Sequence, residues 1–226
     1  RASPARRRDR NPFDPPGGRG YVDGGTVNLS CGGHVRTLTY LVASSIDGYI
    51  TGPDGGDPTG SIFAVDGDHM QPLLEAFPEV VPTHVREQLN FHPENKNFDT
   101  VLEGRNSYQI GLDFGVTNAY RHLEHYVFST TMTEAPDPDV HLVRTDPVAT
   151  VRELKQRDGM GIWLCGGGKL AYTLRHEIDE LVIKLNPVAL GSGIPLFDGP
   201  FDKLGFTLAG TRSFGSGLVL LTYRRA

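Results

Sequence analysis

The sequence predicts an α/β fold in which helices flank a mixed, mainly parallel sheet and an antiparallel hairpin ends the chain. Between residues 99 and 185, short apolar runs alternate with segments of helical pattern, which is typical of parallel strands joined by helices. The end of the chain differs, because β-rich runs at 206–214 and 218–224 are separated by Gly215-Ser216-Gly217, the composition of a hairpin turn. With 226 residues, of which 38% are hydrophobic, the chain can fill such a core.

Composition excludes several other classes of protein. No apolar run approaches the roughly 20 residues that a membrane-spanning helix needs, and charged residues make up 22% of the chain. Two cysteines, Cys31 and Cys165, are too few for a disulfide scaffold; a reducing cytoplasm fits, while a single disulfide stays open. We therefore expect a cytoplasmic protein with no membrane partner.

Charges are unevenly distributed along the chain. Residues 1–20 hold six Arg and two Asp, whereas the remaining residues hold 16 basic and 25 acidic side chains. A body this acidic repels a phosphate backbone. We expect no nucleic-acid partner for the folded part, so any phosphate ligand must be held by local groups.

Residues 1–35 are rich in Gly, Pro and Arg and show neither helical nor strand periodicity. This composition is typical of a flexible or adhering arm. The run Arg6-Arg7-Arg8 suits an anionic partner, although a solvated tail is the more frequent role of such a run. Residues 36–226 are then expected to form a single domain.

The expected domain starts with a β-rich run at 37–46, which ends at Asp47-Gly48 and is expected to be a central strand. A loop rich in Gly, Pro and Asp follows to residue 60. Two short helical patterns come next, at 68–76 and 83–89, before a polar loop that ends at residue 97. We interpret 51–97 as a lid or flap.

Strands and helices alternate in the rest of the chain. Asp146 and Pro147 suit the N-cap and the first turn of a helix that continues to Lys155. The expected strands are 99–104, 125–130, 140–145, 161–165 and 180–185, followed by the hairpin, and the expected helices start at Gly104, at Asp146-Pro147 and at 169–177.

The glycines at 166–168 form the first candidate binding motif. They stand between a buried strand and a helix, so a backbone without Cβ atoms can approach a pyrophosphate, and the helix start offers free amides. Gly166, Gly168 and Ala171 match a G-x-G-x-x-A spacing, but the next strand ends at Asn186-Pro187 rather than at the acid of a dinucleotide fold. A tight strand–helix turn is the alternative.

A second candidate lies in the first turn of an earlier helix. Arg105 and Ser107 follow Gly104, where a guanidinium can grip a 2′-phosphate and a hydroxyl can complete its shell, which favours NADP over NAD. Helix capping and surface charge are the alternative, and for this motif alone the more frequent one. Ser129 and Thr130 end another strand and either contact an adenosine phosphate or close a turn.

Asp47 and Gly48 place a carboxylate beside a flexible glycine at the end of the first strand. Such a carboxylate can orient a substrate or shuttle protons, and an Asx turn is an equally frequent alternative. His122 and His125 have no third ligand nearby and are expected to be surface or packing residues. The Cys165 thiol, on its buried strand, is expected to pack. We expect no metal.

Several of these motifs, in this order, resemble one family. They are Ser45-Ile46-Asp47-Gly48, Gly104-Arg105-x-Ser107-Tyr108, Val127–Thr131, Gly166-Gly167-Gly168, Asn186-Pro187-Val188 and Gly191-Ser192-Gly193. From about residue 37 to 224, the chain resembles the dihydrofolate reductase-like family, which includes the reductase domain of bifunctional riboflavin deaminase-reductases.

The resemblance implies a dihydrofolate reductase-like sheet, NADPH as the cofactor and a homodimer. Arg105 and Ser107 would hold the 2′-phosphate side of the cofactor, and Asp47 and Gly48 would border the nicotinamide and substrate pocket. The expected cofactor-binding residues are Ala43, Gly104, Arg105, Ser107, Tyr108, Ser129, Thr130, Gly166, Gly167, Gly168, Lys169 and Leu170. The glycine pair of the family carries a cis peptide, which the resemblance places at Gly166–Gly167.

We therefore expect an NADPH-dependent reductase that transfers hydride to a C=N or similarly polarised double bond of a small heterocyclic, imine-like or pterin-like substrate. Ser107 stands where the family usually has Thr, and 51–97 is longer than the family's connection, which leaves the substrate open. The alternatives are a stand-alone 5-amino-6-ribosylaminopyrimidine phosphate reductase of riboflavin synthesis and a catalytically silent NADPH-binding module. Dihydrofolate reduction itself needs a carboxylate where only Asp66, Asp68 or Glu75 stand.

Overall fold

The structure is a computed structural model that describes residues 35–226. Its strands are β1 (Leu38–Ser44), β2 (Tyr49–Thr51), β3 (Phe98–Gly104), β4 (Glu124–Phe128), β5 (Val140–Val143), β6 (Gly161–Gly166), β7 (Glu180–Leu185), β8 (Ile194–Pro195), β9 (Phe206–Ser213) and β10 (Val219–Arg225). Its helices are α1 (Met70–Ala76), the 3-10 helix η1 (Pro78–Val80), α2 (Thr83–Leu89), α3 (Arg105–Asp113), α4 (Pro147–Gln156) and α5 (Gly168–Thr173). The arm expected at 1–35 lies outside the described residues apart from its last residue.

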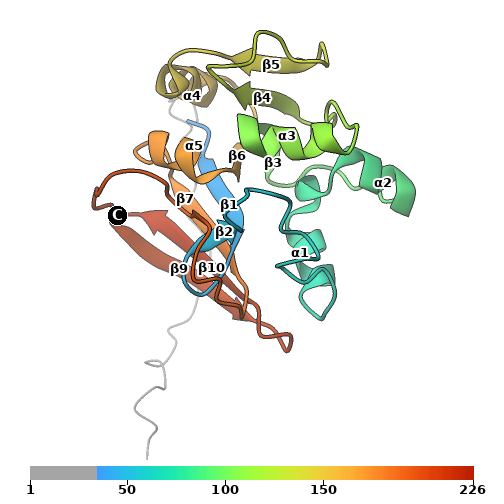
Figure 1. Ribbon diagram of the computed structural model, residues 1–226, viewed down its shortest axis with the longest axis vertical. Coiled ribbons are helices and arrows are strands. Elements are labelled where there is room, and N and C mark those ends of the chain that lie inside the picture. Colours follow the sequence, from blue (N-terminus) through green and yellow to red (C-terminus); the bar gives the residue numbers. More distant parts are fainter. Residues whose placement is uncertain (1–34) are drawn as a thin grey trace, which may run out of the picture. The chain divides into compact units, whose positions relative to one another are not determined.

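Eight strands form one sheet in the order β5-β4-β3-β6-β1-β7-β10-β9 (Figure 1). The neighbours from β5 to β7 all pair in parallel, whereas β10 is antiparallel to both β7 and β9. The mixed, mainly parallel sheet and the C-terminal hairpin that the sequence predicts are therefore confirmed.

β1 lies at the centre of this sheet. It pairs with β6 on one side and with β7 on the other, and its residues from Leu38 to Val42 are all buried. An apolar run without alternation suits such a strand, because both of its faces are covered. The central strand predicted at 37–46 is confirmed, and its last two residues form the turn that leads to Asp47.

α4 begins as the sequence predicts. The carboxylate of Asp146 accepts a hydrogen bond from the amide of Ala149 at 2.9 Å, and Pro147 occupies the first turn. Val151 and Leu154 then face the core. α1 and α2 lie within the two helical patterns expected before β3.

Helices cover both faces of the sheet (Figure 1). On one face, Leu154 of α4 and Leu174, just after α5, join an apolar cluster that includes Leu38 and Tyr40 of β1. On the other face, the segment that holds α1, η1 and α2 packs against β3 and β6, and α3 packs against β4 and β5.

The second half of segment 51–97, which was expected to be a lid or flap, is held by hydrogen bonds to the start of β3. Glu79 of η1 is fully buried, and its Oε1 accepts the backbone amides of Lys96, Asn97 and Phe98, where β3 begins. A buried carboxylate that receives three amides holds the chain firmly. This part of the segment therefore belongs to the fixed fold.

Two local features differ from the sequence predictions. β2 and β8 pair as a small second sheet where no separate strand was expected, because strands of three and two residues are too short to show alternation. α5 ends at Thr173 rather than near residue 177, and the next residues continue as turns in which the amide of Glu177 reaches the carbonyl of Leu174. Within residues 35–226, no helix has the length and apolar character that crossing a bilayer requires.

Candidate active site

The expected site residues gather at the carboxyl ends of the parallel strands. β1 ends at Ser44, β3 at Gly104, β6 at Gly166 and β7 at Leu185. Parallel pairing brings these ends to one edge of the sheet, which is the edge where open α/β sheets bind ligands.

Helix α3 and the glycine pair form one corner at this edge. A Cβ atom on Gly166 would lie 3.4 Å from Ser107 Oγ, and one on Gly104 would lie 3.8 Å from the carbonyl oxygen of Gly166. The peptide between Gly166 and Gly167 is cis, as the resemblance implies. The fold thus brings together two motifs that are far apart in the sequence.

Arg105 is exposed at the start of α3, beside Ser107. Its guanidinium contacts Gln109 Oε1 at 3.4 Å, one turn along the helix, and a long contact of this kind between exposed groups adds little stability. Lys169 is exposed as well. Both cations are therefore accessible to an anion at this edge.

The turn after β4 is closed by Ser129. Its Oγ accepts the amides of Thr131 and Met132 at 3.2 and 3.0 Å, so the turn-closing alternative describes this side chain. Thr130 is exposed next to it. Contact between an adenosine phosphate and this turn stays a prediction.

Three of the expected cofactor-binding residues are tightly packed within the fold. Tyr108 is 2% exposed, and its hydroxyl donates to the carbonyl of Thr117 at 2.6 Å. Gly168 lies against the carbonyl oxygen of Pro195, which leaves no space for a Cβ atom. Leu170 is buried in the core. Their contact with a cofactor stays a prediction: the side chains of Tyr108 and Leu170 are buried, and Gly168 can offer only its backbone.

Asp47 anchors one loop to another. Its carboxylate accepts the hydroxyl of Ser45 at 2.6 Å and the amides of Leu190 and Gly191 at 3.0 and 2.7 Å. These hydrogen bonds, that of Ser45 first, lower the pKa of Asp47 to about 2. At neutral pH the carboxylate holds no proton to donate, so this geometry favours the orienting role expected of Asp47 over the proton shuttle. Gly48 follows with a φ of 86°, which favours glycine.

The sheet face that carries α1 and α2 becomes partly open at the carboxyl edge. On this face, the last residue of each of β1, β6 and β7 is partly exposed. The residue two positions before it in the same strand is at most 3% exposed. The partly exposed residues are Ala43, Cys165 and Lys184, which we call the open floor, and the packed ones are Leu41, Trp163 and Val182. Burial raises the pKa of the Cys165 thiol well above its usual range, so this thiol is neutral.

A buried polar pair that sequence patterns did not indicate lies on the same face. His125 Nε2 is 2.8 Å from Glu103 Oε2, and both side chains are at most 6% exposed. His125 Nδ1 is 3.0 Å from Asn118 Oδ1, an oxygen that also accepts the amide of Tyr120. Nδ1 must therefore donate, and Nε2 shares one proton with Glu103. The sequence signal that could have indicated this pair is an ionisable residue in each of two largely apolar strands, Glu103 in β3 and His125 in β4.

Of the acidic residues considered for dihydrofolate reduction, Asp68 is committed to the hairpin turn. It accepts the amides of Gly215 and Ser216 at 2.6 and 2.9 Å, which lowers its pKa. The neighbouring His69 Nδ1 contacts the hydroxyl of Ser216 at 2.9 Å, beside a small cleft of about 100 Å³ that Asn186 also lines. The turn between β9 and β10 is thus joined to the segment before α1.

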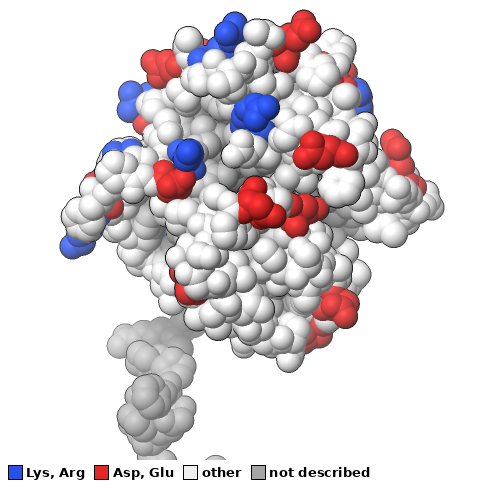
Figure 2. Space-filling view, in the orientation of Figure 1, with Lys and Arg blue, Asp and Glu red and all other residues white. Residues whose placement is uncertain are grey.

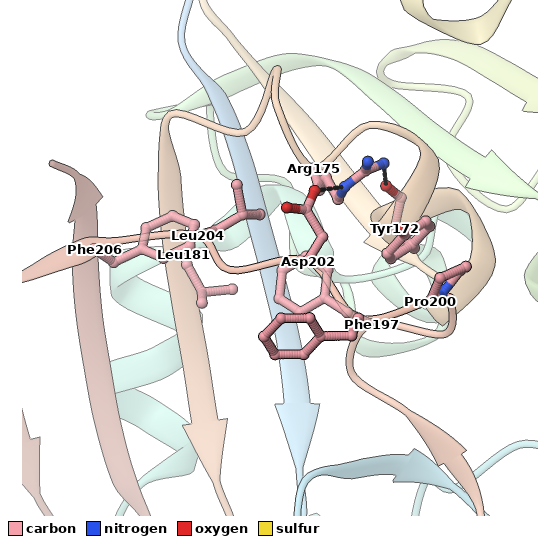
Figure 3. A pocket seen from close by; sticks show the side chains of 10 residues that line it. Tyr172, Arg175, Leu181, Phe197, Pro200, Asp202, Leu204 and Phe206 are labelled. Atoms are coloured by element: carbon pink, nitrogen blue, oxygen red, sulfur yellow. Dashed lines mark hydrogen bonds and ion pairs between the residues drawn. The ribbon is translucent and has the colours of Figure 1, made fainter.

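A larger cleft of about 340 Å³ lies away from these residues (Figure 3). It is lined mainly by apolar side chains of residues 197–206, with Tyr172 of α5, Leu181 of β7 and the ion pair of Arg175 and Asp202 at 2.6 Å. It includes none of the expected site residues, so we place the candidate active site at the carboxyl edge.

Charges on the face shown in Figure 2 are interspersed. Lys and Arg side chains stand among Asp and Glu rather than as one basic surface. Nucleic acids are bound by continuous basic patches or stripes, and the face in view offers none.

Comparison with known proteins connects this geometry to a family. The model of the RibD C-terminal domain matches residues 36–220. Two proteins of Bacillus subtilis (strain 168) are similar over most of their length: YwjB is 31% identical over 84% of this chain and 98% of its own, and YyaP is 28% identical over 83% and 94%. Both are uncharacterized.

Two crystal structures share the fold. A protein of Shewanella sp. PV-4, provisionally assigned to riboflavin biosynthesis, is 26% identical with a TM-score of 0.59 over 84% of this chain and 99% of its own. A diaminohydroxyphosphoribosylaminopyrimidine deaminase/5-amino-6-(5-phosphoribosylamino)uracil reductase of Thermotoga maritima is 16% identical with a TM-score of 0.54. The match covers 85% of this chain but 57% of the Thermotoga protein, whose likeness concerns the fold alone.

Proposed function

The chain belongs to the RibD C-terminal domain family, and from this premise we propose that it is an NADPH-dependent reductase. It transfers hydride to a C=N or similarly polarised double bond of a small heterocyclic, imine-like or pterin-like substrate. The dinucleotide supplies the hydride, and the protein supplies position and electrostatics.

The observation that carries this proposal is the corner formed by α3 and the glycine pair. Arg105 and Ser107 stand at the first turn of α3, and Ser107 Oγ lies close to the backbone of Gly166. An exposed guanidinium, a hydroxyl and backbone without Cβ atoms fit a phosphorylated dinucleotide. Arg105 and Ser107 would hold the 2′-phosphate side, and Gly166 and Gly167 would allow the pyrophosphate to approach.

The open floor is the place for the reacting end of the cofactor and the substrate. Ala43 has no bulky side chain, so a planar ring can lie on β1 there, between Cys165 and Lys184. Asp47 holds the loops after β1 and β7 together beside this floor. Prealigned loops of this kind lower the entropy cost of bringing two reactants together.

A second candidate function is a stand-alone 5-amino-6-ribosylaminopyrimidine phosphate reductase of riboflavin synthesis. It is favoured by the family and by the provisional assignment of the Shewanella relative. Its test is consumption of NADPH with 5-amino-6-(5-phosphoribosylamino)uracil, compared with neutral cyclic imines and pterins. A silent NADPH-binding module would bind the cofactor and turn over none of them.

The cofactor site is tested by titrating the protein with NADPH and NADH, followed by fluorescence and thermal shift. Arg105→Ala should weaken NADPH binding by roughly 10- to 100-fold, the value of about 1.5–3 kcal/mol for hydrogen bonds to a charged group, and leave NADH binding nearly unchanged. Arg224→Ala is the matched control, because Arg224 is an exposed arginine at the far end of β7 and β10. Equal affinity for both dinucleotides in the unmodified protein, or no binding, would overturn the proposal.

The homodimer that the resemblance implies belongs to the same proposal. Sedimentation equilibrium across a range of protein concentrations tests it. A mass that stays at the 24.7 kDa of one chain at every concentration would count against a dimer.

A further inference from the structure

Lys184 occupies a place in the open floor that the cofactor motifs do not explain. In the sheet register it pairs with Ala43 of β1 and with Leu220 of β10, so its cross-strand neighbours carry no charge. Its side chain is half-buried, two positions beyond the fully packed Val182 on the same face. Lys184 therefore lies next to Ala43, where the reacting ring is proposed to lie.

Lys184 also lacks the partners that the fold gives another buried lysine. Lys155 donates to the carbonyl of Glu177 and pairs with Asp179, both at 2.6 Å. In the described part of the chain, Lys184 Nζ makes no hydrogen bond and no ion pair. An ammonium group without a protein partner on this partly open floor is available to a ligand.

The groups around Lys184 leave it as the available acid. Burial lowers the pKa of the Lys184 ammonium. The Cys165 thiol itself is held neutral with a raised pKa, and Glu103 and Tyr120 act on Cys165 from the side away from β7. Asp47 is already ionised at neutral pH. General acids work best when their pKa lies near the operating pH, which burial achieves for lysine.

We propose that Lys184 is the proton donor of the reduction, a catalytic role that rests on the proposed reductase function. When hydride is added to the carbon of a C=N bond, the π electron pair moves to nitrogen. That nitrogen forms a bond to a proton from Lys184 Nζ, whose N–H bond breaks. The products are the amine, the oxidised dinucleotide and a neutral Lys184, which solvent reprotonates at the partly open floor.

A matched substrate pair separates proton donation from every other role of the side chain. 3,4-Dihydroisoquinoline, used above its own pKa, is a neutral imine that needs a proton, whereas 2-methyl-3,4-dihydroisoquinolinium already carries its positive charge and needs none. Lys184→Gln should slow single-turnover reduction of the neutral imine by about 10²–10⁴-fold, and should change reduction of the iminium by less than about threefold. Lys184→Arg should resemble Lys184→Gln, because a guanidinium stays charged but does not give up its proton.

A measurement without turnover keeps the inference separate from the proposed function. Competitive labelling with acetic anhydride across pH, read by mass spectrometry, reports the pKa of Lys184 against the exposed Lys203. We expect the pKa of Lys184 to lie below that of the exposed lysine, because burial disfavours its charged form. Equal titration of the two lysines, or full imine reduction by Lys184→Arg, overturns the role of Lys184. Absence of NADP⁺ binding in the unmodified protein overturns instead the reductase function on which it rests.

Discussion

The carboxylate of Asp47 accepts the backbone amide of Gly191 at 2.7 Å and so ties the turn after β1 to the loop after β7. β1 and β7 are neighbours in the sheet, and Lys184 and Ala43 lie opposite each other two or more residues before these loops. The anchor therefore joins the two loops that follow these strands of the open floor. A ligand on this floor would lie beside two loops that the Asp47 carboxylate holds together.

Replacing Asp47 by Asn should destabilise the protein in a pH-dependent way. The folded-state pKa of Asp47 is lowered to about 2, below the 3.8 of an unperturbed group, by the hydroxyl of Ser45 and the amides of Gly191 and Leu190. A lowered pKa stabilises the folded state above the unfolded pKa, and this contribution is lost as pH falls through the folded pKa. The difference in free energy of unfolding between the two proteins should be constant from pH 5 to 7 and shrink between about pH 4 and 2.

Urea unfolding across this pH range is the measurement. A difference that stays constant down to pH 2 would contradict the assignment of the low pKa to Asp47. Asp66→Asn is a suitable control, because Asp66 is an exposed carboxylate in a neighbouring loop.

Gly104 and Gly168 should respond differently to the same substitution. A Cβ atom on Gly168 would collide with the carbonyl oxygen of Pro195, whereas one on Gly104 would meet its nearest neighbour, Leu170 Cβ, at 3.7 Å. Gly168→Ala should therefore cost about 1–3 kcal/mol of stability through overpacking. Gly104→Ala should keep nearly the stability of the unmodified protein and lose NADPH affinity. Thermal unfolding and NADPH titration of both variants test the pair, and equal stability loss in both would contradict it.

The sequence predicts most of the sheet because the pattern of apolar residues in a strand shows which of its faces are buried. The run at 37–46 is apolar without alternation, which marks a strand covered on both faces, and Gly215-Ser216-Gly217 marks the hairpin turn. The pair β2–β8 escapes prediction, since its strands are held by a contact between Tyr49 and Pro195 that no local pattern encodes.

The candidate site is predictable in its motifs and less so in its side chains. Arg105 and Ser107 meet the glycine pair as the resemblance implies, but Tyr108 turns into the core, because a motif fixes sequence order and not the direction of each side chain. Glu103 and Lys184 were not indicated as site residues. Glu103 is notable because its strand lies beside that of His125, and Lys184 because its ammonium group has no protein partner within residues 35–226. Both are properties of the folded chain that the sequence order does not show.

Loss of Glu79 should loosen the segment that precedes β3. The fully buried carboxylate accepts the amides of Lys96, Asn97 and Phe98, and Glu79→Ala leaves these donors without an acceptor. We expect a destabilisation of at least about 1.5–3 kcal/mol, the value of one hydrogen bond to a charged group. Hydrogen exchange at the amides of residues 96–98 should accelerate, while Glu87→Ala, at an exposed position of α2, should leave it unchanged. Unaltered exchange in Glu79→Ala would show that other contacts hold the segment.

Glu103 and His125 should be strongly coupled in stability. They share one proton at 2.8 Å in a buried site, so removing either partner leaves the other without compensation. Each of Glu103→Met and His125→Leu should cost about 3–5 kcal/mol. The double variant should regain much of that loss, because two apolar side chains of similar volume need no partner. Chemical denaturation of all four proteins gives the coupling energy, and additive losses would mean that the two groups do not act as a pair.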